Sequence, residues 1–246
     1  MMRKAWLLVC LLWLAACRLD IAPVVVEWNR DPGALIVAAD TRGGGLPHAV
    51  AMSHIPDARV WGDGRIVWVE FKDDGSSVVW EGYLTEEALA NLLRFTVEEG
   101  FFGWEDHYEP ANPPTDLPSS HITVNMTDQS KTVSQYFDGA PAGFWRIYER
   151  VPLGVSDAQQ LVPQRGLLRA WLRNDAIDAA SAIPWSADAD LALSELVSDG
   201  RWIEGPLGAF VWKNLRQHGD GALFREDDNI YGLSLQVPGL SLEEPQ

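Results

Sequence analysis

The chain lacks thiols almost entirely. Only Cys10 and Cys17 occur among its 246 residues, and both lie within the first 17 positions. The remainder can therefore use neither a catalytic cysteine nor a disulfide. Its stability has to come from burial of apolar side chains.

Motifs for metal, nucleophile and nucleotide chemistry are also missing. No G-x-S-x-G or S-x-x-K sequence marks a serine nucleophile, and no glycine-rich phosphate loop is present. Asp188, Asp190 and Glu195 do not follow the order of a calcium-binding loop. No HExxH or similar ligand pair occurs among the five histidines, which are His48, His54, His107, His121 and His218. We therefore expect no cofactor, and the sequence identifies no catalytic residue.

Basic side chains are scarce. The chain has 19 Lys and Arg against 35 Asp and Glu, which gives a formal net charge of −16. Such a surface repels the phosphates of nucleic acids and anionic lipid headgroups, so we expect no nucleic-acid partner. Acidic runs such as Asp73-Asp74-Gly75 and Glu226-Asp227-Asp228 are expected to be solvated turns.

The first residues have the pattern of a secretory leader. Arg3 and Lys4 form a short positive region, and residues 5–16 follow without a charge. This apolar run is much shorter than the roughly 20 residues that a membrane-spanning helix needs. Residues 1–16 are therefore interpreted as a signal peptide.

The end of the leader carries a more specific signal. Leu14-Ala15-Ala16-Cys17 resembles the lipobox of bacterial prolipoproteins. The resemblance implies acylation of the Cys17 thiol, cleavage between Ala16 and Cys17, and acylation of the new amino terminus. The alternative is an ordinary leader with an accidental cysteine.

Several acyl chains on one residue suffice for stable anchoring, so we expect a protein held on a membrane outside the cytoplasm. In lipoproteins sorted between two membranes, Asp directly after the lipid-bearing cysteine favours inner-membrane retention. Arg18 occupies that position here, and Asp20 is the first acid.

Hydrophobic patterning predicts an antiparallel α+β fold with β-meanders, hairpins and a few packed helices. Residues 17–46 are interpreted as lipid anchor and turn-rich tether, with Gly43-Gly44-Gly45 as a flexible link. A first α+β unit is predicted over residues 47–150, and a second over residues 165–240. Residues 151–164 are expected to connect the two units.

Within the first unit, Gly62-Asp63-Gly64 predicts a hairpin turn, and Thr85 followed by two glutamates predicts the start of a helix ending near Gly100. A second hairpin is expected around Asp128-Gln129, and a short helix over residues 141–150. From Val60 to Tyr148 the chain also resembles domains of uncharacterised bacterial lipoproteins, through Gly62-Asp63-Gly64, residues 89–93 and Gly100-Phe101-Phe102. That resemblance implies no activity.

In the second unit, residues 167–172, 191–193 and 201–203 are expected to form strands. A helix beginning at Pro206 follows, and then two closing strands. Trp80-Glu81-Gly82-Tyr83-Leu84 and Trp202-Ile203-Glu204-Gly205 form a local echo, for which duplication and chance are the alternatives.

Candidate chemistry remains open at three places. His107 with Glu105 and Asp106 suggests either a weak metal site or a solvated acidic loop, and Ser119-Ser120-His121 is a polar triplet. His48 and His54 are expected to be solvated loop histidines. Most tryptophans are expected in the core, with an exposed cluster as the alternative.

Two functions fit these observations. The first is a lipid-tethered binding or interaction module of the cell envelope, with a protein or glycan partner. The second is a tethered hydrolase whose site assembles only in three dimensions. A cleft that joins His107 or His121 to carboxylates would favour the hydrolase. An exposed aromatic strip would favour the binding module.

The lipobox yields the first prediction. If the Cys17 thiol carries lipid, Cys17→Ser should accumulate as unprocessed precursor and lose metabolic labelling with a radioactive fatty acid, because the acyl acceptor is gone. Equal labelling of the wild type and the variant would contradict the lipoprotein interpretation.

Overall fold

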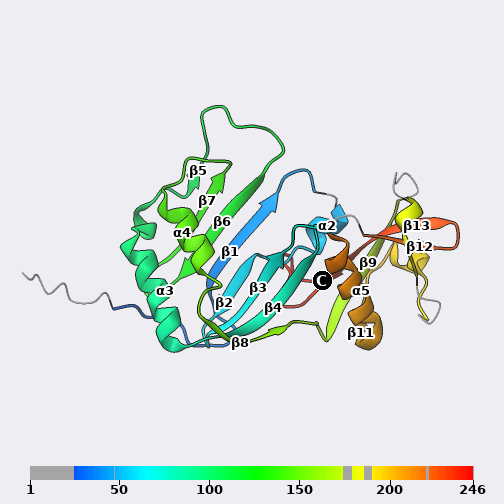
Figure 1. Cartoon of the computed structure of the whole chain (residues 1–246), viewed down its shortest axis with the longest axis horizontal. Helices are drawn as coiled ribbons and strands as arrows, with labels where there is room; N and C mark the ends of the chain where they lie inside the picture. The colour runs from blue at the N-terminus through cyan, green and yellow to red at the C-terminus, as the bar shows by residue number, and fades with distance from the viewer. Residues whose placement is uncertain (1–24, 47, 174–178, 186–189, 220–221, 246) are drawn as a thin grey trace, which may run out of the picture.

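The structure is a computed structural model, described here for residues 25–46, 48–173, 179–185, 190–219 and 222–245 (Figure 1). The expected signal peptide, the Ala16–Cys17 cleavage site, the lipidation site at Cys17 and the acid Asp188 lie outside these residues. No helix of the described part is long and apolar enough to cross a membrane.

Two β-sheets and four α-helices make up the described part of the chain. The larger sheet, sheet A, has the strand order β5-β7-β6-β1-β2-β3-β4-β8. Its strands are β1 (Leu35–Gly43), β2 (Ala58–Trp61), β3 (Arg65–Phe71), β4 (Ser77–Leu84), β5 (His107–Tyr108), β6 (Pro118–Asn125), β7 (Ser130–Tyr136) and β8 (Val155–Gln160).

The smaller sheet, sheet B, has the order β10-β12-β13-β9-β11. Its strands are β9 (Arg165–Leu172), β10 (Ile183–Pro184), β11 (Arg201–Glu204), β12 (Leu223–Glu226) and β13 (Asn229–Gln236). The helices are α2 (His48–Met52), α3 (Glu86–Glu98), α4 (Gly143–Arg150) and α5 (Gly205–Gln217), with 3-10 turns η1 (Phe101–Gly103), η2 (Ala179–Ser181) and η3 (Leu193–Leu196). All pairings are antiparallel except β5 with β7 and β10 with β12, which confirms the predicted antiparallel α+β class.

Helices α3 and α4 cover one face of sheet A (Figure 1). Leu89, Leu92 and Leu93 of α3 pack with Phe144 and Ile147 of α4 in one buried cluster. The sheet contributes the side chains that point to this face, among them Val37, Val60, Ile66, Ile122 and Val133. Alternation along each strand places every second residue here.

The start of α3 follows from its sequence as predicted. Thr85 is the N-cap, and its hydroxyl accepts a hydrogen bond from the Ala88 amide at 3.1 Å. Glu86 and Glu87 occupy the first turn, where the helix dipole favours acidic side chains. Gly100 follows the C-cap with φ of +81°, a conformation that glycine adopts without strain.

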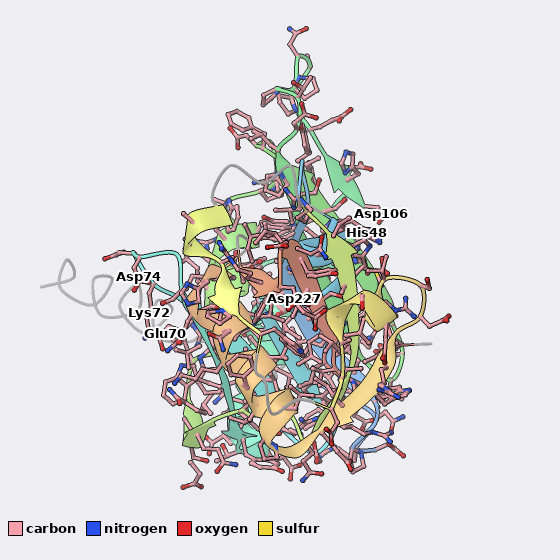
Figure 2. All side chains as sticks on the ribbon, turned by 90° about the vertical axis from the view of Figure 1, so that its right-hand side faces the viewer. His48, Glu70, Lys72, Asp74, Asp106 and Asp227 are labelled. Carbon is pink, nitrogen blue, oxygen red and sulfur yellow. The ribbon has the colours of Figure 1, made fainter. Side chains whose placement is uncertain are left out.

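Sheet B and α5 cover part of the opposite face of sheet A. Trp61, Val67 and Val79 of β2, β3 and β4 belong to the same buried cluster as Leu168 of β9 and Phe224 of β12. The two sheets therefore share a hydrophobic core. The charged side chains Glu70, Lys72 and Asp74 lie at the outer end of the β3–β4 hairpin (Figure 2).

The expected tether over residues 17–46 is wrong for residues 35–43, which form β1 in the middle of sheet A. Leu35-Ile36-Val37-Ala38-Ala39 is a continuous apolar run, which a central strand shows in place of alternation. Trp28 is buried too, and its indole N–H donates to the Gly62 carbonyl at 3.1 Å. The polar end of β1, from Asp40 to Gly43, pairs with β6 although its composition resembles a turn.

Two other elements differ from prediction. The expected connector over residues 151–164 contains β8, an exposed and polar edge strand that pairs with β4. Its sequence carries no apolar alternation because most of its side chains are exposed. The strand expected over residues 191–193 is replaced by η3, whose first amides are capped by the Glu226 carboxylate.

The similarity between residues 80–84 and 202–205 includes one glycine in each segment, and the two glycines have different structural roles. Gly82 lies within β4, where an added Cβ would come within 2.4 Å of the Val155 side chain. Gly205 begins α5 with φ of +61° and has open space around it. Different physical requirements explain the same residue type, so the echo gives no support to a duplication.

The expectation that most tryptophans lie in the core is met by Trp28, Trp61 and Trp212, whereas five others in the described residues are only partly buried. In the described residues, Trp145 of α4 and Trp202 of β11 are the tryptophans that remain exposed. These two elements lie at opposite ends of the molecule (Figure 1). The described part of the chain thus shows no cluster of exposed tryptophans.

The packing of α3 yields a stability prediction. Leu93→Ala should lower the free energy of unfolding by about 2–5 kcal/mol, because it leaves a cavity in the core under sheet A. Glu87→Ala, on the exposed side of the same helix, is the control and should change stability by less than about 0.5 kcal/mol. Chemical denaturation measures both, and equal midpoints would show that the buried face is misassigned.

Candidate functional site

A polar group of side chains lies on β1 and β6, on the face of sheet A opposite α3 and α4. Asp40 pairs with His121 across the two strands, and Arg42 pairs with Ser119. Side chains of residues directly opposite in an antiparallel pair point to the same side and lie about 5 Å apart. The apolar layer under sheet B involves β2, β3 and β4, whereas β1 and β6 carry these polar groups on the same face.

A pocket of about 410 Å³ opens beside these residues. It is lined by Arg42, Gly43, Gly44, Leu46, Ala51, His54, Ser119, His121, Leu242 and Glu243. Its walls thus come from β1, β6, the α2 region and the C-terminal segment. This volume lies within the range of about 300–1,000 Å³ that is typical of small-molecule sites.

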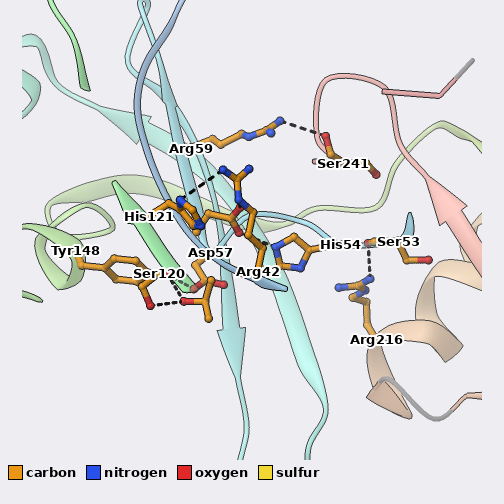
Figure 3. Close-up of polar contacts among 12 residues, drawn as sticks. Arg42, Ser53, His54, Asp57, Arg59, Ser120, His121, Tyr148, Arg216 and Ser241 are labelled. Atoms are coloured by element: carbon orange, nitrogen blue, oxygen red, sulfur yellow. Dashed lines mark hydrogen bonds and ion pairs between the residues drawn. The ribbon is translucent and has the colours of Figure 1, made fainter. Parts of the chain in front are cut away.

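Backbone and side-chain hydrogen bonds hold the walls together. The Leu242 amide donates to the His54 carbonyl at 2.9 Å, and Arg59 donates to the Ser241 carbonyl at 3.4 Å. Arg216 of α5 donates to the Ser53 carbonyl at 3.3 Å (Figure 3). The C-terminal segment and the residues after α2 are therefore fixed against the sheets.

The strongest contact in the site joins Asp40 and His54. The Asp40 carboxylate accepts a 2.6 Å hydrogen bond from His54 Nε2, although the two residues are 14 apart in sequence. Their side chains are only 7% and 16% exposed. A carboxylate oxygen accepts, so His54 Nε2 carries the hydrogen of this bond, which leaves Nδ1 as the ring nitrogen not engaged with Asp40.

Arg42 lies between the two histidines (Figure 3). Its Nη2 is 3.5 Å from His121 Nδ1, and its Nε is 3.9 Å from Asp40 Oδ2. Burial lowers the pKa of His121, and the positive charge of Arg42 lowers it further. His121 is consequently neutral at pH 7, with Nδ1 facing the guanidinium as an acceptor.

Behind the pocket, a chain of hydroxyl groups ends on a second carboxylate, Asp57, which is partly buried. Tyr148 of α4 donates to Asp57, and the Tyr148 oxygen lies 2.8 Å from the Thr41 hydroxyl. Thr41 in turn lies 3.1 Å from the Ser120 hydroxyl. Burial raises the pKa of Asp57, the Tyr148 hydrogen bond opposes this effect, and the nearby Asp40 charge adds to it.

The structure separates the candidate residues proposed from sequence. His121 and Ser119 face the pocket, whereas Ser120 points to the other side of β6 and bonds Thr41. His107 is half exposed on β5 and bonds Ser134 at 2.8 Å. No group of three or more potential metal ligands occurs in the described residues, including Glu105 and Asp106 beside His107.

The remaining candidates serve as structural contacts. Glu195 forms a 3.7 Å ion pair with Arg201, and Glu226 caps η3. Gly43 ends β1 and lines the pocket, so the expected flexible link is wrong at that position. His54, expected to be a solvated loop histidine, is largely buried against Asp40.

Asp40 and Arg42 are not among the residues predicted from sequence, because the composition of residues 17–46 resembles a tether. The alternation of Asp40 with Arg42, and of Ser119 with His121, is the available signal once both segments are recognised as strands. Comparisons of the chain with protein families, curated proteins and solved structures found no match.

Asp57 yields a prediction on pH dependence. Its raised pKa means that the folded state binds this proton more tightly than the unfolded state, so this group destabilises the fold as pH rises above about 4. Asp57→Asn keeps an acceptor for Tyr148 and removes the charge. It should therefore be as stable as the wild type near pH 3 and more stable at pH 7.

The control for this experiment is Asp73→Asn, in the exposed β3–β4 turn. Urea denaturation between pH 3 and pH 8 measures the stability of all three proteins. An Asp57→Asn variant that loses stability relative to wild type as pH rises would contradict the assignment.

Proposed function

We propose that the chain is a lipid-anchored protein of the cell envelope whose folded domain binds a partner without turning it over. Leu14-Ala15-Ala16-Cys17 supports the anchor. With a net charge of −16 the surface has little attraction for anionic lipid, so residence on a membrane would depend on this anchor. The proposed partner is a protein or a glycan, and nucleic acid is disfavoured by the charge.

The pocket on β1 and β6 is the observation that carries the binding proposal. It combines apolar walls with convergent polar groups, as ligand sites generally do. Arg42, His54 and His121 all line it, and each can form a directed hydrogen bond to a polar group of a partner. The hydrogen bonds that join the pocket walls keep these polar groups in place before a ligand arrives, which reduces the entropy cost of binding.

A membrane-tethered hydrolase is the second candidate, because the Asp40–His54 pair has the form of an oriented general base. Nδ1 of His54 could take a proton from water, or from the Ser119 hydroxyl in the same pocket. However, no hydrogen bond joins Ser119 to His54 within the described residues. A binding function therefore requires fewer correctly placed side chains than a hydrolase, which also needs its nucleophile next to the base.

A pocket-directed crosslinking experiment tests the binding proposal. A photo-crosslinking amino acid at Leu46, on the pocket wall, should give a discrete adduct on intact cells, because the partner reaches that wall. The same group at Leu153, exposed near the end of α4, is the control and should give none. Adducts of equal yield at both positions would contradict a pocket-specific partner.

A substrate panel separates the two candidates. The protein should show no turnover of ester, peptide, phosphate or glycoside substrates, and EDTA should leave its melting temperature unchanged. Turnover that is lost in His54→Gln and retained in His218→Gln, a change at an exposed histidine, would replace the binding module by the hydrolase.

A further inference from the structure

The pocket has a polar side and an apolar side, and the two together define a ligand. Arg42 and His121 supply the polar side, and Leu46, Ala51 and Leu242 the apolar side. We infer that the pocket binds a small carboxylate with a short apolar tail, whether a free acid or the end of a larger partner. This inference rests on the proposed binding function and specifies its ligand.

Arg42 is suited to the carboxylate head group. Its side chain is 42% exposed, and within the described residues the one carboxylate within 4 Å is Asp40, at 3.9 Å from Nε. That separation is too long for a hydrogen bond, so the pair leaves the guanidinium free to engage an additional anion. A planar guanidinium binds a planar carboxylate through two parallel N–H···O bonds, which an ammonium cannot do.

His121 adds a second donor. Because its Nδ1 faces Arg42 as an acceptor, the neutral ring carries its hydrogen on Nε2. The His121 ring lines the same pocket. Arg42 and His121 thus offer N–H groups from neighbouring strands to one anionic group.

Two carboxylates of the described residues lie at the site, Asp40 and Glu243, and neither forms a hydrogen bond to the Arg42 guanidinium. Asp40 is nearly buried behind His54, so an ammonium entering the pocket meets the Arg42 charge instead. Asp40 Oδ2 is buried without a hydrogen-bond partner, and the nearby Arg42 compensates its charge. Glu243 also lines the pocket, and its exposure to solvent reduces its repulsion of an anion without removing it.

The apolar wall sets the size of the tail. Leu46 and Leu242 come from segments on either side of the opening, and Ala51 of α2 presents only a methyl group. Gly43 has no side chain, and a Cβ there would meet nothing within 4 Å. A tail of a few carbons therefore has apolar contacts and room to enter.

A matched set of probes tests the head group. Butanoate, butan-1-ol and butylamine share one tail and differ in charge, and inorganic phosphate is an anion without a tail. The full chain in lipid nanodiscs is titrated with each probe by ligand-detected NMR, with empty nanodiscs as the blank. Butanoate should bind at least tenfold more tightly than each of the other probes.

Variants locate the binding. Arg42→Gln should weaken the binding of butanoate at least tenfold, and Arg42→Lys should weaken it less. Arg94→Gln, at a surface position of α3, should leave butanoate binding unchanged. Ala51→Trp should block binding by filling the pocket while Arg42 remains. Melting temperatures within about two degrees of wild type would show that the variants are folded.

The other outcomes distinguish this inference from the binding function. Butanol or butylamine binding as tightly as butanoate, and lost in Ala51→Trp, would overturn the carboxylate ligand and leave the binding function standing. Phosphate binding more tightly than butanoate would also overturn it, because the tail would then be irrelevant. If no probe binds while Leu46 still gives its crosslinked adduct, the carboxylate inference alone is wrong.

Discussion

The site depends on one constraint, which is that sheet B covers only part of one face of sheet A. Trp61, Val67 and Val79 bury their side chains against sheet B, in a core continuous with α5. On the other face, α3 and α4 bury apolar side chains from β1, β2, β3, β6 and β7. The polar residues of β1 and β6 thus lie on the face of sheet A that contacts sheet B. Sheet B covers β2, β3 and β4 there, so β1 and β6 can form a pocket wall.

A buried carboxylate at the edge of such a layer has to be compensated. Asp40 loses hydration, and an unpaired charge in that position would cost several kcal/mol. His54 compensates part of this cost through a 2.6 Å hydrogen bond, and Arg42 contributes its charge at 3.9 Å. The backbone beside His54 is itself held by hydrogen bonds, because the Leu242 amide donates to the His54 carbonyl and Arg216 donates to the Ser53 carbonyl. The polar contacts that stabilise the fold at this point are therefore the same ones that shape the pocket.

Local sequence signals were enough to predict elements whose ends and buried faces are determined by residues close together in sequence. Thr85 with Glu86 and Glu87 defined the start of α3, Gly62-Asp63-Gly64 defined the β2–β3 turn, and Pro206 marked the start of α5. They failed for β1, whose first half is apolar on both faces because its neighbours bury it, and for β8, which is polar because it lies at an edge. The Asp40–His54 contact depends on the tertiary path between β1 and α2. No spacing of residue types along the chain encodes it, so the site could not be predicted.

The position of β1 also changes what a lipid on Cys17 would mean for the pocket. If residues 18–46 were a loose tether, the domain could move up to about 100 Å from the membrane, at roughly 3.4 Å per extended residue. Because Trp28 is buried and Leu35 begins β1, a tether from Cys17 could extend no further than Trp28, which is eleven positions along the sequence and at most about 40 Å. The acidic domain would then be kept close to a surface whose anionic headgroups repel it.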